Sequence, residues 1–122
     1  AHFGRIVIMS SRASVGMAQR SSYAATKAGQ IALARTWALE LATDGITVNC
    51  VAPGPIEATE MFHDVVPKDS ETARKLAAAI PVRRLGLPDD VARAVMFFID
   101  PANSFVTGQN LFVCGGTSIG SL

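Results

Sequence analysis

Two short apolar runs flank one long helical segment in the first half of the chain, and this arrangement constrains the fold more than any other feature. The runs are GRIVIMS (4–10) and ITVNCVA (46–52), and both are rich in β-branched residues and bounded by turn residues. The segment between them, 22–43, is predicted to be a helix. Two strands joined by a helix are normally parallel, with a right-handed crossover. The sequence therefore predicts an α/β fold built on a parallel sheet.

Residues that start and stop helices support this division of the chain. Ser21 or Ser22 is expected to cap the first helix, and the DG pair (44–45) is expected to end it. A second helix is expected to begin at Pro88 and to end before Pro101. It is predicted to turn five apolar side chains inward: Val91, Ala92, Val95, Met96 and Phe98.

The second half of the chain is predicted to add a third strand, QNLFVCGG (109–116). Residues 55–80 are expected to form a loop with one helix, 71–80, over the strand ends. Loops at this edge of a parallel sheet carry binding sites. A solvated connector without a role is the alternative for this segment.

Tyr23 is the only tyrosine of the chain, and one of its three lysines, Lys27, follows four residues later. On a helix this spacing places both side chains on one face, one turn apart. An ammonium group close to the phenol would favour the phenolate and let the tyrosine act as acid and base near neutral pH. Taken alone, the pair fits a packed tyrosine and a solvated lysine better, because two-residue motifs are common.

The surroundings of the pair favour a functional role. It follows a strand that ends in two serines, and ligands bind at the strand ends of parallel sheets. Ser11, Tyr23 and Lys27, in this order, resemble the catalytic segment of the short-chain dehydrogenase/reductase family, in which a serine after a strand precedes a Tyr-x-x-x-Lys motif. The resemblance spans nearly the whole chain through three further segments: ALARTWALELATDGITVNCVAPGPIEATE, RLGLPDDVARAVMFF and VTGQNLFVCGG.

This resemblance implies an NAD(P)-binding, Rossmann-like, doubly wound parallel sheet and an oxidoreductase that interconverts a secondary alcohol and a ketone. Tyr23 would be the acid/base, Ser11 would orient and polarise the substrate oxygen, and Lys27 would assist the tyrosine and bind the nicotinamide ribose. Tyr23 and Lys27 would both contact the cofactor, NAD or NADP, which supplies the hydride. A 3-oxoacyl thioester is the commonest substrate for such a set of motifs, and the small-molecule partner is expected to be an alcohol or ketone.

The PGPI segment would lie along the nicotinamide, although alone it resembles an ordinary turn after a strand. Pro53 and Gly54 would allow a close backbone approach, and Ile56 would offer its backbone amide to the carboxamide. The threonine expected four residues beyond that glycine is replaced by Ala58, and Thr59 follows as the candidate cofactor contact.

No Gly-x-x-x-Gly-x-Gly turn occurs in the sequence, although the family carries this phosphate-binding motif near its N-terminus. The chain, 1–122, is therefore expected to be the C-terminal half of one Rossmann-fold domain of about 250 residues, with the N-terminal phosphate-binding half absent and required for activity. Two alternatives remain open. One is a non-catalytic fragment that acts as an assembly module, and the other is an epimerase or dehydratase of the same family.

Composition limits the partners further. The formal net charge of +1 and the lack of a long basic run argue against nucleic acid. The apolar runs are too short for a membrane span and no signal-peptide pattern occurs, so a cytoplasmic protein without a membrane partner is expected.

Cys50 and Cys114 lie in apolar runs and are expected to be buried thiols, and the two distant histidines form no metal-ligand pattern. Apolar residues exceed one face of the helix 22–43, so cover is expected on two of its sides. The resemblance implies that a second copy of the chain provides the outer cover, in a homo-oligomer that is a dimer or tetramer.

Overall fold

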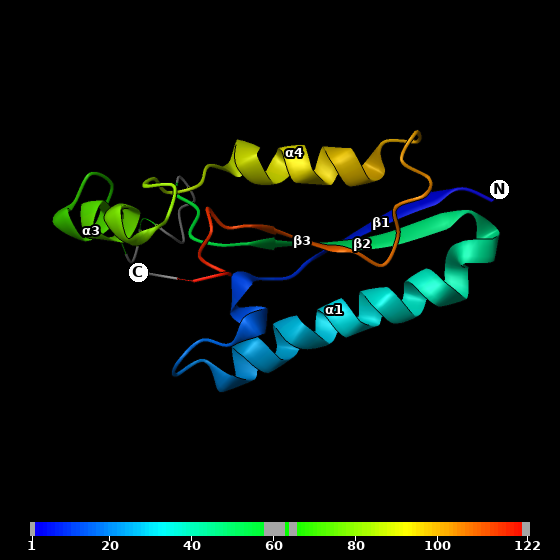
Figure 1. Cartoon of the computed structure of the whole chain (residues 1–122), viewed down its shortest axis with the longest axis horizontal. Helices are drawn as coiled ribbons and strands as arrows, with labels where there is room; N and C mark the ends of the chain where they lie inside the picture. Colours follow the sequence, from blue (N-terminus) through cyan, green and yellow to red (C-terminus); the bar gives the residue numbers. More distant parts are fainter. Residues whose placement is uncertain (1, 58–62, 64–65, 121–122) are drawn as a thin grey trace.

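The computed structural model describes residues 2–57, 63 and 66–120, which form a parallel sheet with a helix on each face (Figure 1). The α/β fold with a parallel sheet, as predicted, is confirmed. In Figure 1, α4 lies above the sheet and α1 below it. The elements in chain order are β1 (Gly4–Met9), the 3₁₀ helix η1 (Arg12–Val15), α1 (Ser21–Leu41), the 3₁₀ helix η2 (Ala42–Asp44), β2 (Ile46–Pro53), α3 (Glu71–Ala79), α4 (Pro88–Ile99) and β3 (Asn110–Val113).

The central strand of the described sheet is β2, which pairs in parallel with β1 on one side and with β3 on the other. Its side chains alternate between the two faces, as the pleat of a strand requires. Val48 and Cys50 therefore face α1, whereas Val51 faces α4. All three predicted strands are confirmed to within a few residues at their ends.

A buried asparagine holds the central strand to the segment that leads into β3. The Asn49 amide donates to the carbonyl of Val106 at 3.0 Å, and its oxygen accepts the backbone N–H of Gln109 at 3.0 Å. Asn49 is 1% exposed, so both polar ends of its side chain need such partners. This asparagine therefore has a structural role in the described chain.

Helix α1 approaches the sheet closely because small side chains lie on its inner face. Ala34 and Ala38 are buried, one turn apart, against Val48 and Cys50. The predicted burial of the Cys50 thiol is confirmed, and that burial raises its pKa. Leu33 and Trp37, each next to one of these buried alanines in the sequence, remain partly exposed.

The start of α1 differs from the prediction. Arg20, not Ser21 or Ser22, is the residue before the first helical turn, and no side chain caps the helix there. Ser21 already has a place in the helix, so it cannot provide the extended backbone of a cap. The end is as predicted, because Gly45 adopts φ 71° and closes η2.

Helix α4 packs on the opposite face through a stripe of apolar side chains. Ala94 and Phe98 are buried with Val51. The prediction that Ala92 and Met96 point inward is wrong, because both are exposed. A helix turns by about 100° per residue, so these two positions lie on the side away from Ala94 and Phe98.

Candidate functional site

A pocket of about 380 Å³ lies where β1 and β2 end, the edge at which parallel sheets bind ligands. We call it the tyrosine pocket. Ser11 follows β1, Pro53 and Gly54 lie at the end of β2, and Tyr23 comes from the first turn of α1. The lining is completed by Arg12, Met17, Arg20, Pro55, Leu76, Ala79, Ile80 and Thr117. The structure thus brings four of the predicted site residues to one cavity.

Lys27 lies beside Tyr23 rather than in the pocket wall. Its Nζ is 5.7 Å from the centre of the tyrosine ring and donates a hydrogen bond to the carbonyl of Met9 at 3.3 Å. The helix is held at this point by Ser10, whose hydroxyl donates to the Lys27 carbonyl at 2.8 Å. The lysine charge is therefore placed between the end of β1 and the tyrosine. The sequence analysis did not predict that the buried Ser10 holds the helix. Its position beside Ser11 at the end of the strand could have indicated a role.

The Ser11 hydroxyl is oriented by the backbone of the turn that follows β1. Its oxygen accepts the backbone N–H of Ala13 at 3.1 Å, which caps η1. A hydroxyl has one proton to donate, and no described residue accepts it. Ser11 can therefore donate a hydrogen bond into the tyrosine pocket.

Arg20 is a site residue that the sequence reasoning missed. Its guanidinium carbon lies 4.3 Å from the centre of the Tyr23 ring, in a cation–π arrangement. Arg20 is three residues before Tyr23 and lies just before the first turn of α1, so no helical spacing in the sequence indicated the contact. The tyrosine ring therefore has two cations near it, Arg20 and Lys27.

Gly54 is constrained by the packing of the chain itself. A Cβ at this position would lie 2.8 Å from Cα and Cβ of Cys114 and 3.2 Å from the hydroxyl of Thr117. The N–H of Gly54 donates to the carbonyl of Val113 at 2.9 Å. The segment after β3 therefore needs a glycine here, whether or not a cofactor also approaches it.

Ile56 lies outside the tyrosine pocket and pairs with Gly86 in an isolated parallel bridge. Gly86 donates to the carbonyl of Pro55 at 2.9 Å and accepts the N–H of Glu57 at 2.8 Å. In a parallel bridge of this kind, the backbone amide of the central residue points away from its partner. The Ile56 amide is thus directed away from Gly86. Thr59, the other predicted cofactor contact, lies outside the described residues.

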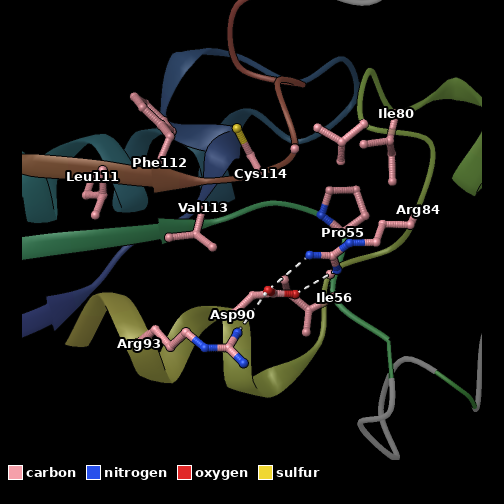
Figure 2. Close-up of a pocket in the computed structure, with 13 residues that line it drawn as sticks. Pro55, Ile56, Ile80, Arg84, Asp90, Arg93, Leu111, Phe112, Val113 and Cys114 are labelled. Carbon is pink, nitrogen blue, oxygen red and sulfur yellow. Dashed lines mark hydrogen bonds and ion pairs between the residues drawn. The ribbon is translucent and has the colours of Figure 1, made fainter. Parts of the chain in front are cut away.

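Figure 2 shows a second pocket, of about 350 Å³, beside the start of α4. Asp90 accepts two hydrogen bonds from the Arg84 guanidinium, at 2.8 and 3.1 Å, and one from the backbone N–H of Leu87 at 2.8 Å. Arg93 lies 3.4 Å from the same carboxylate. Hydrogen bonds from Arg84 and Leu87 hold the pKa of Asp90 far below its usual range. The charges of this pocket are therefore paired with one another.

Cys114 follows β3 and contributes to the second pocket. Its predicted burial is confirmed. Burial acts to raise the pKa of this thiol, but the hydrogen bonds from Ser118 and the neighbouring backbone outweigh it and the pKa is lowered. The sulfur lies 3.2 Å from the Ser118 hydroxyl.

A family model described as enoyl-(acyl carrier protein) reductase matches residues 1–118 of the chain. Among solved structures, a protein described as a short chain dehydrogenase/reductase family protein is 38% identical, with a TM-score of 0.82 over 94% of this chain. The chain belongs to the short-chain dehydrogenase/reductase family. The resemblance found in the sequence is thereby confirmed, and so is the Rossmann-like fold.

Individual members of the short-chain dehydrogenase/reductase family are clearly similar to this chain. The BbsD subunit of (2S)-[(R)-hydroxy(phenyl)methyl]succinyl-CoA dehydrogenase from Thauera aromatica is 46% identical over 95% of the chain and 45% of that protein. The 3-oxoacyl-[acyl-carrier-protein] reductase FabG from Thermotoga maritima is 43% identical over 95% of the chain and 46% of that protein. An actinorhodin polyketide ketoreductase solved with NADPH is 35% identical, with a TM-score of 0.85, over 96% of the chain and 48% of that structure.

The chain thus spans about half the length of the curated relatives it matches. Members of the family are NAD(P)-dependent dehydrogenases and reductases, and the solved neighbours include proteins bound to NADPH and to NADP. The donor set of the site fits the nicotinamide end of such a cofactor, because the Lys27 ammonium has three protons and uses one on Met9. A glycine-rich turn that could hold a pyrophosphate is not found among the described residues. None of the described helices combines the length and apolar character needed to cross a bilayer.

Proposed function

We propose that this chain forms the acid–base site of an NAD(P)-dependent oxidoreductase that interconverts a secondary alcohol and a ketone. The observation that carries the proposal is the tyrosine pocket, where Ser11 and Tyr23 meet at the strand ends and Lys27 lies one helical turn along α1. The arrangement provides a hydrogen-bond donor, a proton donor and a cation near one another. These are the groups that reduction of a carbonyl requires from a protein.

In the direction of reduction, Ser11 would donate a hydrogen bond to the ketone oxygen and fix its position. Tyr23 would transfer its phenolic proton to that oxygen, so that the carbonyl becomes a hydroxyl as the carbon gains a hydride. The hydride would come from a bound NAD(P)H, which would be oxidised to NAD(P)⁺. Lys27 would stabilise the phenolate that remains, because its charge lies within 6 Å of the tyrosine ring, at 5.7 Å. The reverse steps oxidise the alcohol.

A 3-oxoacyl thioester is the substrate class that we propose to test first. The names of two relatives support it, since one acts on a 3-oxoacyl group and the other on an acyl-CoA. The pocket provides apolar surface for an acyl chain through Met17, Leu76 and Ile80. The substrate would enter beside α3, which contributes Leu76 to the wall.

A homo-oligomer, either a dimer or a tetramer, is proposed for the full-length protein. Leu33 and Trp37 are 40% and 37% exposed, and Leu39 is 83% exposed, on a helix whose inner face already packs on the sheet. Apolar side chains on both sides of a helix indicate that each side is covered. A second copy of the same helix across a two-fold axis would cover the outer side.

The deciding experiment is an assay of the full-length protein with acetoacetyl-CoA and either NADPH or NADH, monitored by loss of the reduced nicotinamide. Turnover that requires Tyr23 is the expected result. A protein that neither binds the dinucleotide nor turns over any ketone or alcohol would favour the assembly module instead. Inversion of a hydroxyl centre, or loss of water from the substrate, without net change in the cofactor would favour an epimerase or dehydratase.

A further inference from the structure

We infer that the substrate is an oxo or hydroxy acid whose anionic group, a carboxylate close to the reacting carbon, is bound by Arg20. This inference rests on the proposed function, because it takes Tyr23 to mark the reacting carbon. It adds a free carboxylate, which a simple 3-oxoacyl thioester lacks and which neither the motif nor the fold specifies, so that the acid would replace the thioester as the substrate class. It is supported by the position of the Arg20 cation, which stacks on the ring of Tyr23 in a pocket whose described lining residues include no acid.

The position of Arg20 is defined by its contact with Tyr23. The guanidinium carbon lies 4.3 Å from the ring centre, so the cation is beside the phenol at the pocket wall. Stacking on an aromatic ring leaves the N–H edges of a guanidinium free to bind a carboxylate with two hydrogen bonds. Arg20 forms no ion pair within the described part of the chain.

Arg12 adds a second positive charge to the same wall. Its Nε donates to the carbonyl of Thr117 at 3.4 Å, and no carboxylate among the described residues pairs with it. The described residues that line the pocket include no aspartate or glutamate. Helix α1 also begins here, without a side-chain cap and without an acid in its first turn, so its positive end is uncompensated. An anion is the complement that this surface lacks.

In the second pocket, by contrast, the chain itself supplies an acid to two arginines. Arg84 and Arg93 both contact the carboxylate of Asp90. No such acid is provided for Arg12 and Arg20 by the described residues. The difference favours a ligand, rather than the fold, as the partner of the charges in the tyrosine pocket.

The distance between Arg20 and Tyr23 distinguishes two sources of negative charge. A carboxylate a few bonds from the carbonyl can reach the guanidinium while the carbonyl oxygen contacts the phenol. The phosphate of a carrier arm lies at the far end of a long chain from its thioester and cannot do so. The apolar lining from Met17, Leu76 and Ile80 suits the hydrocarbon part of the same acid.

The test compares two ligands of one carbon skeleton, acetoacetate and methyl acetoacetate, which differ in charge. Calorimetry on the full-length protein, with and without NADP⁺, measures binding of the ketone where reduction cannot occur. We expect acetoacetate to bind about tenfold more tightly than the ester, the range of a charge-assisted hydrogen bond. Arg20→Gln should remove this preference and Arg20→Lys should restore part of it. Arg35→Gln, on an exposed part of α1, is the matched control and should bind as the wild type does.

Tyr23→Phe separates this inference from the proposed function, because phenylalanine keeps a ring under Arg20 and removes the proton donor. A preference for the acid that persists in Tyr23→Phe supports recognition by Arg20 even if no ketone is reduced. Equal binding of acid and ester to the wild type, or no binding of either, would overturn the inference while turnover of acetoacetyl-CoA still supported the proposed function. A loss of acetoacetyl-CoA binding in Arg20→Gln with unchanged acetoacetate binding would also overturn it, since the anion recognised would then be the carrier's phosphate.

Discussion

The ammonium group of Lys27 lies 5.7 Å from the centre of the Tyr23 ring, one turn along α1, and it is held there by a hydrogen bond to the carbonyl of Met9. The strand therefore fixes where the lysine charge lies, and the helix fixes where the tyrosine lies. Two covalently distant segments must keep their positions for the pair to act together. Because different segments hold the two side chains, each residue can be replaced by mutation and its effect measured separately.

Tyr23→Phe should remove the proton donor and leave most of the cofactor contacts intact. We expect kcat of the full-length enzyme to fall by about 10²–10⁴-fold, with little change in the dissociation constant of the dinucleotide. Steady-state kinetics and fluorescence titration of the cofactor measure the two quantities. Ser11→Ala should have a smaller effect on kcat. A Tyr23→Phe enzyme that kept more than about a tenth of the wild-type kcat would contradict the assignment.

Lys27→Met should impair both steps, because the same ammonium group stabilises the phenolate and binds the ribose in the proposed site. We expect a lower kcat together with weaker cofactor binding, in contrast to Tyr23→Phe. The same titration compares the two variants directly. If Lys27→Met bound the dinucleotide as tightly as the wild type, the proposed contact of the lysine with the cofactor would be wrong.

Gly54→Ala should destabilise the fold, because its Cβ would lie 2.8 Å from backbone and side-chain carbons of Cys114. Overpacking of this kind typically costs about 1–3 kcal/mol in the free energy of unfolding. Gly29→Ala is the control, since a Cβ there meets nothing within 4 Å and alanine favours a helix over glycine. Urea unfolding of the full-length variants should show a loss for Gly54→Ala and no loss for Gly29→Ala. Equal stability of the two variants would show that the segment after β3 moves away at no cost.

Asp90→Asn should lower stability at neutral pH and matter less in acid. The pKa of Asp90 is lowered in the folded state, so the folded protein binds fewer protons than the unfolded chain. Its contribution is therefore present above the unfolded value of about 3.9 and is lost as pH falls below it towards the folded pKa. Urea midpoints of wild type and variant, measured from neutral pH down to about pH 3, should draw closer at the acid end without becoming equal, because the folded pKa lies lower still. A difference that stayed constant over this range would show that the carboxylate charge is not what stabilises the start of α4.

Trp37→Glu, with Leu33→Glu as a second variant, should disrupt the proposed oligomer by placing a charge in the apolar outer face of α1. Light scattering of the full-length wild type should give a mass of two or four chains at micromolar concentration. The variants should shift towards the monomer, and circular dichroism checks that they stay folded. A wild-type protein that is monomeric under these conditions would refute the interface. Arg35→Gln again serves as the control on the same helix.

The sequence determined the features that depend on neighbours along the chain. The strands at 4–10 and 46–52 and the helix between them follow from hydrophobic periodicity, which responds to local backbone geometry. The pairing of Tyr23 with Lys27 follows equally directly, because four residues make about one helical turn. The parallel order of the first two strands follows from the length of the connection between them.

Only the tertiary structure decided which residues surround Tyr23 and Lys27. Thr117 reaches the tyrosine pocket from the other end of the chain, and Cys114 requires a glycine at position 54. Such contacts join segments far apart in sequence, and no local periodicity encodes which of them meet. That Arg20 has no acidic partner among the described lining residues follows only from the tertiary structure, because those residues come from several segments of the chain. Packing of distant segments, rather than any local pattern, therefore set the charge of the proposed site.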